Sequence, residues 1–114
     1  MELVRDPISL AALKRLAEAR FGNLVKGVVD VERGIMALDA DMHADEEALL
    51  LSDGSRQGDL WGVNLYPDDF ATESFLEFDS MINIRPGRGN RSRSVEDAAI
   101  RAAIEALVAR LVVA

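Results

Sequence analysis

The stretch LVKGVVDVERGIMALDA, residues 24–40, decides how this chain is expected to fold. It contains two apolar runs rich in β-branched residues, which the short segment Glu32–Gly34 separates. Two such runs joined by a turn that contains glycine predict a β-hairpin, and hence an antiparallel sheet. Alternation along the strands predicts an apolar face made of Val25, Val29 and Val31 with Met36, Leu38 and Ala40, and an opposite face with Lys26 and Asp30.

The segments toward the two ends of the chain predict helices. Ser9 can cap a helix over residues 10–21, and Gly22 would end it because glycine adopts the left-handed conformation at little cost. Ser94 precedes two nearby acidic residues and is predicted to cap the final helix. The apolar stripe of that helix would comprise Ile100, Ile104, Leu107, Val108 and Leu111.

The middle of the chain contains three further elements. Residues 45–52 fit either a short helix or a buried strand, and we favour a helix because acidic residues begin the segment and Gly54 can end it. Asp45 would cap that helix. Residues 61–66 and 75–85 predict strands, the second with apolar and polar side chains in alternation.

Together with a short extended segment at residues 2–5, these elements indicate a single α+β domain over residues 1–114. We expect a largely antiparallel sheet of about four or five strands, with the N-terminal and C-terminal helices packed on one face and a short middle helix. The other face can be left to solvent or to a partner. A homodimer through that face, or through the apolar C-terminal stretch, is therefore one hypothesis.

Composition limits the classes of protein to consider. The chain has no cysteine, which excludes a disulfide framework, a thiolate nucleophile and a cysteine-ligated zinc site. Its first residues, MELVRDPISL, lack the basic and apolar regions of a secretory leader. No apolar run approaches the roughly 20 residues that cross a bilayer. We therefore expect a cytoplasmic protein without membrane association.

Charge is distributed unevenly along the chain. The net charge is −7, yet residues 80–95 contain four arginines and no acid, so the rest of the chain carries −11. An acidic surface repels the phosphates of nucleic acids, so we do not expect non-specific nucleic acid binding. One basic segment in an acidic protein is the main functional clue.

That basic segment, RPGRGNRSR at residues 85–93, is the first candidate site, and we call it the arginine loop. The loop combines guanidinium groups with glycines and leads into a predicted helix start, and this combination is suited to binding an anion. The anion can be a small molecule or an acidic segment of a protein. The glycine spacing is not that of a P-loop. The alternative is that the arginines pair with the protein's own carboxylates. The candidate residues are Arg85, Arg88, Asn90, Arg91, Arg93 and Ser94.

Two further constellations contain the only histidine. In an extended segment Asp41, His43 and Asp45 would point the same way and could hold a divalent metal, although acids at a helix start explain them without one. A polar cleft could support acid–base chemistry, or be an ordinary solvated face. Its residues would be His43, Asn64, Glu77, Asp79 and Asn83. No nucleophile with a partnered base is evident, so the sequence does not favour an enzyme, and we expect no cofactor.

Two blocks of sequence carry a resemblance to a known family. They are HADEEALLLSDGSRQGDLWGVNLYP at residues 43–67 and EFDSMINIRPGRGNRSRSVED at residues 77–97. With RDPISL and VVDVERGIMAL, they resemble a small prokaryotic family of uncharacterised proteins, a domain of unknown function. The resemblance implies a bacterial single-domain protein and transfers no activity or ligand to any residue.

Three hypotheses follow. The first is a non-enzymatic binding module whose arginine loop receives an anion or an acidic partner protein. The second is a small metal-assisted hydrolase that uses His43 with Asp41, Asp45 or Asp79. The third is a structural homo-oligomer without a small-molecule ligand.

Overall fold

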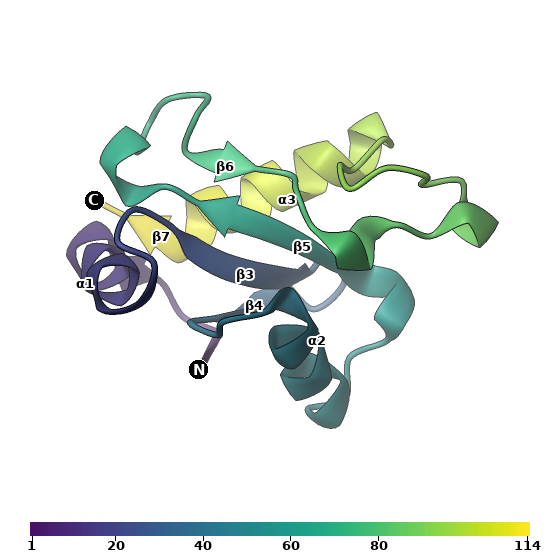
Figure 1. Cartoon of the computed structure of the whole chain (residues 1–114), viewed down its shortest axis with the longest axis horizontal. Coiled ribbons are helices and arrows are strands. Elements are labelled where there is room, and N and C mark those ends of the chain that lie inside the picture. The colour runs from purple at the N-terminus through teal and green to yellow at the C-terminus, as the bar shows by residue number, and fades with distance from the viewer.

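The computed structural model describes all 114 residues, and its centre is a five-stranded antiparallel sheet in the order β1–β4–β3–β5–β6 (Figure 1). These strands are β1 (Glu2–Val4), β3 (Val25–Asp30), β4 (Ile35–Leu38), β5 (Leu60–Leu65) and β6 (Leu76–Glu77). A separate parallel pair joins β2 (Ile8–Ser9) to β7 (Val112–Val113). The helices are α1 (Leu10–Arg20), α2 (His43–Ser52) and α3 (Ala98–Leu111). Short 3₁₀ turns lie at η1 (Gln57–Asp59), η2 (Pro67–Asp69), η3 (Met81–Asn83) and η4 (Pro86–Arg88). The predicted α+β fold is confirmed.

The predicted hairpin is confirmed as β3 and β4, which pair antiparallel. Gly34 has a φ of 68°, the left-handed conformation that this turn requires. The Asp30 carboxylate holds the turn, because its Oδ1 accepts the backbone N–H groups of Glu32 and Arg33, each at 2.9 Å. Asp30 lies on the face opposite Val25 and Val29, as alternation predicts, and it is fully buried because that face of the sheet is covered too.

Apolar side chains pack on both faces of the sheet. On the first face, α1 and α3 bury Leu13, Ala17, Ile104, Leu107 and Leu111 against a strand layer that includes Val25, Val29, Met36 and Leu38. On the second face, α2 packs Leu50 against Val28, Ile35, Ala37 and Leu60, with Ile82 of η3 beside them. The two terminal helices thus share one face, as predicted. The other face is covered by α2 and η3 and is not left to solvent.

The ends of the helices show which predicted caps form. Ser9 caps α1, because its Oγ accepts the Ala12 N–H at 3.0 Å. Residues 43–52 are helical, as favoured, but α2 begins at His43, so Asp45 lies in the first turn and not at the cap. Asp97 caps α3 and Ser94 does not. The predicted apolar stripe of α3 is confirmed, with four of its residues buried and Ile100 half-buried.

The predicted strand at residues 75–85 was wrong. Only Leu76–Glu77 pairs with β5, and the chain then turns through η3. Ser80 begins that turn, because its Oγ accepts the Ile82 N–H at 3.3 Å. Beyond β6 the edge of β5 is completed by a side chain, since the Asn83 amide accepts the Gly62 N–H at 2.8 Å and donates to the Gly62 carbonyl at 3.0 Å.

Candidate functional site

The arginine loop is built around the buried side chain of Asn90. Its Nδ2 donates to the carbonyl of Asn83 at 2.7 Å, and also to the carbonyls of Ser92 and Ser94. Its Oδ1 accepts the Glu96 N–H at 2.8 Å. One buried amide therefore fixes both arms of the loop. Asn90 is structural, and the loop holds its arginines in a defined arrangement.

The backbone donors of this loop already have an anionic partner within the chain. One carboxylate oxygen of Glu96 accepts the N–H of Arg91 at 2.7 Å, the N–H of Ser92 at 2.9 Å and the Ser92 hydroxyl at 3.1 Å. These backbone bonds lower the pKa of Glu96. The first N–H groups of α3 are likewise taken by Asp97, at 2.8 and 3.1 Å. An external anion would therefore meet side chains and not free backbone N–H groups.

Two of the four arginines are committed to contacts inside the protein. Arg85 lies over the Trp61 ring at 4.7 Å and donates to the Leu60 carbonyl at 2.5 Å, with Glu47 at 3.7 Å. Burial lowers the pKa of its guanidinium. Arg93 forms an ion pair with Asp79, Nε to Oδ1 at 2.5 Å. Neither residue offers an uncompensated charge.

The other two arginines keep their charge available. Arg88 is exposed, and its guanidinium donates to the carbonyl of Gly58. The same guanidinium lies 6.0 Å from the centre of the Trp61 ring. A carbonyl is not a carboxylate, so the positive charge of Arg88 is not neutralised. The exposed Arg91 side chain forms no hydrogen bond or ion pair.

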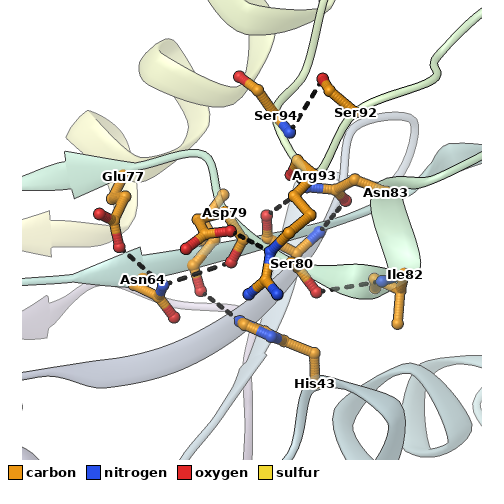
Figure 2. A network of polar contacts seen from close by, with 12 residues as sticks. His43, Asn64, Glu77, Asp79, Ser80, Ile82, Asn83, Ser92, Arg93 and Ser94 are labelled. Atoms are coloured by element: carbon orange, nitrogen blue, oxygen red, sulfur yellow. Dashed lines mark hydrogen bonds and ion pairs between the residues drawn. The ribbon is translucent and has the colours of Figure 1, made fainter.

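Most of the residues predicted to line a polar cleft lie together at the edge where β5 meets β6, in a network of polar contacts that we call the polar cluster (Figure 2). Asn64 of β5 donates from Nδ2 to Glu77 of β6 at 2.9 Å and to the Asp79 carbonyl at 3.3 Å. The Tyr66 hydroxyl donates to the same Glu77 oxygen at 3.0 Å. The ion pair of Asp79 with Arg93 joins this group to the arginine loop. Asn83 is the exception, because its amide is bound to backbone groups.

His43 approaches this group from α2. Its Nε2 lies 2.8 Å from the Val63 carbonyl, and because a carbonyl only accepts, Nε2 carries the proton. Burial lowers the pKa of His43, although the bond to the Val63 carbonyl acts in the opposite direction. The ring is therefore neutral near pH 7 and is oriented by the backbone, which is a structural role.

The metal hypothesis finds no support in the geometry. The Asp41 carboxylate forms an ion pair with Arg20, Oδ1 to Nη1 at 2.7 Å. Asp45 lies in the exposed first turn of α2. No three side chains among the histidine, aspartates and glutamates gather closely enough to hold a metal ion.

Sequence reasoning missed Glu46, the most perturbed acid of the chain. Its side chain is fully buried on α2, where Oε2 accepts the Ala40 N–H at 3.1 Å and Oε1 has no partner. Burial raises the pKa of Glu46 to about 9, so the group is neutral at pH 7. The spacing of His43, Glu46 and Leu50 could have placed it on the inner face of a helix.

Fold and site define a class: a small α+β protein whose sheet is covered on both faces, with a fixed arginine loop beside a polar cluster. A family model matches residues 2–111, and the chain belongs to that family, described as "Protein of unknown function (DUF5674)". Neither the curated proteins nor the solved structures gave a match. None of its helices combines the length and apolar character needed to span a bilayer.

Proposed function

We propose that this chain is a non-enzymatic binding module that receives an anion or an acidic protein segment at Arg88 and Arg91. The observation that carries the proposal is the difference between these two residues and their neighbours. Arg85 and Arg93 are held by Trp61, Glu47 and Asp79, whereas neither of the two exposed guanidinium groups forms an ion pair with a carboxylate.

The construction of the loop supports this function. Asn90 and Glu96 fix its backbone by hydrogen bonds, so little conformational entropy is lost when a ligand binds. Guanidinium groups form charge-assisted bonds with carboxylates and phosphates, and these are stronger than neutral hydrogen bonds. The acidic remainder of the chain would repel an anion elsewhere, which limits binding to this loop. A bacterial cytoplasmic setting is part of the proposal: the bacterial origin rests on the family resemblance, and the absence of cysteine is compatible with a reducing compartment.

We expect the double variant Arg88→Ala/Arg91→Ala to lose at least about tenfold in affinity for an acidic probe, because two charge-assisted bonds are removed. The probes are inorganic phosphate, adenosine triphosphate and a polyglutamate peptide, titrated by calorimetry at low ionic strength, where screening is weak. The matched control is Lys14→Ala/Arg15→Ala on the exposed side of α1, which removes the same charge. Equal weakening of binding in the control would show that the effect comes from net charge alone, and would contradict the proposed site. Unchanged binding in the double variant would contradict it as well.

A further inference from the structure

A second surface lies between β6 and α3, and no residue of the arginine loop lines it. A groove of about 780 Å³ runs there, and most of its lining is apolar. The segment that follows η2, residues 70–78, contributes Phe70, Phe75, Leu76 and Phe78, and α3 contributes Val108 and Ala109. Three of the four phenylalanines of the chain thus line one surface groove. Its volume falls within the roughly 300–1,000 Å³ of typical ligand sites.

The groove runs beside a free edge of the sheet. β6 pairs only with β5 and lies at the margin of the sheet (Figure 1). The Tyr66 N–H donates to the Phe75 carbonyl at 2.8 Å, so Leu76, one residue further along, directs its backbone N–H and C=O away from β5. An extended peptide can bind to such an edge by main-chain hydrogen bonds.

The groove continues into an acidic depression of about 370 Å³, which shares Glu73 and Leu76 with it. Asp69, Glu73 and Glu77 line this depression, and no lysine or arginine does. None of the three forms an ion pair, although arginines neutralise Asp39, Asp41, Asp53 and Asp79 elsewhere.

The other charged residues of the groove leave this surface negatively charged overall. Glu105 of α3 adds a fourth carboxylate, and the only base is Arg101, which lies over the Phe78 ring at 4.8 Å. A ligand for this surface therefore needs an apolar part for the groove and a positive group for the acidic depression.

We propose that this surface binds an extended peptide segment of a partner protein, with an apolar side chain in the groove and a lysine or arginine in the acidic depression. The apolar lining, the free strand edge and the uncompensated carboxylates each match one part of that ligand. The surface is distinct from the arginine loop, so the inference stands apart from the proposed function.

The probe is a short fluorescein-labelled peptide in which lysine and leucine alternate, and its binding is measured by fluorescence anisotropy. We expect Asp69→Asn/Glu73→Gln to weaken binding at least about tenfold, through loss of charge at exposed positions. Ala109→Trp should abolish binding by filling the groove, while Ala103→Trp, on an exposed part of α3 outside the groove, should not. Circular dichroism checks that each variant folds.

Three results would overturn the inference. One is equal binding by wild type and Ala109→Trp, and another is no binding by wild type at millimolar peptide. The third is equal affinity for a peptide in which serine replaces leucine, which would indicate attraction to the acidic surface alone. Arg88→Ala/Arg91→Ala should bind the lysine–leucine peptide normally, so failure at one surface is distinguishable from failure at the other.

Discussion

Replacing Glu46 with glutamine should stabilise the fold at pH 7 by up to about 3 kcal/mol. The pKa of the buried carboxyl is about 9 in the fold against an ordinary value of 4.5. Between these values the folded state binds one more proton than the unfolded state, so Glu46 lowers stability as pH rises, by about 1.4 kcal/mol per unit. Glutamine has no proton to lose. The gain is an upper figure, because Oε1 has no partner in the wild type and the new amide would have none either.

The measurement is urea unfolding of wild type and Glu46→Gln between pH 4.5 and 8.5. The difference in unfolding free energy should be near its minimum at the acid end and should grow steadily with pH. His43 acts in the opposite direction, because its lowered pKa makes stability rise as pH approaches 6.5 from below, but it is common to both proteins and cancels. Glu18→Gln, on the exposed side of α1, is the control. Parallel profiles for wild type and Glu46→Gln would show that Glu46 does not titrate as described.

Replacing Asn83 with alanine should cost about 3–5 kcal/mol of stability, because two buried hydrogen bonds and one part-buried hydrogen bond lose one partner each. Asn83 is fully buried and binds the Gly62 N–H, the Gly62 carbonyl and the Arg93 carbonyl. Removing the amide leaves those backbone groups without partners. A loss of this size is a large part of the roughly 5–15 kcal/mol that stabilises an ordinary domain.

Urea unfolding again gives the result, with the exposed Asn23→Ala as the matched control. Asn83→Asp tests the mechanism, because a carboxylate can still accept from the Gly62 N–H but cannot donate to either carbonyl. We expect it to be at least as unstable as the alanine variant near neutral pH. A cost below about 1 kcal/mol for Asn83→Ala would mean that the amide does not complete the sheet edge.

The hairpin and the helices could be predicted because their signals are local. β3 and β4 follow from alternating apolar residues around Gly34, and α2 follows from acids at its start and Gly54 at its end. Local signals also misled. Residues 75–85 alternate like a strand, but the bonds of Asn83 to Gly62, 21 residues away, replace strand pairing there.

The candidate site could be predicted only in outline. Composition singled out the arginine loop, and alternation placed Glu77 and Asp79 near each other. The pairing of Arg93 with Asp79 and the stacking of Arg85 on Trp61 depend on tertiary packing. Ser94 and Asp97 are both residue types that cap helices, and only the hydrogen bonds of the folded loop distinguish them.

The pairing of β2 with β7 has a consequence for how the protein is made. Ile8 lies opposite Val112, so the partner of β2 is synthesised 104 residues after it. During translation β2 cannot pair with β7 until nearly the whole family-matched region, residues 2–111, has left the ribosome. Contacts between residues far apart in the sequence slow folding, because the chain loses the conformational entropy of closing the loop before the contact stabilises it. We therefore expect the nascent chain to form its β3–β4 hairpin early and to close this parallel pair last.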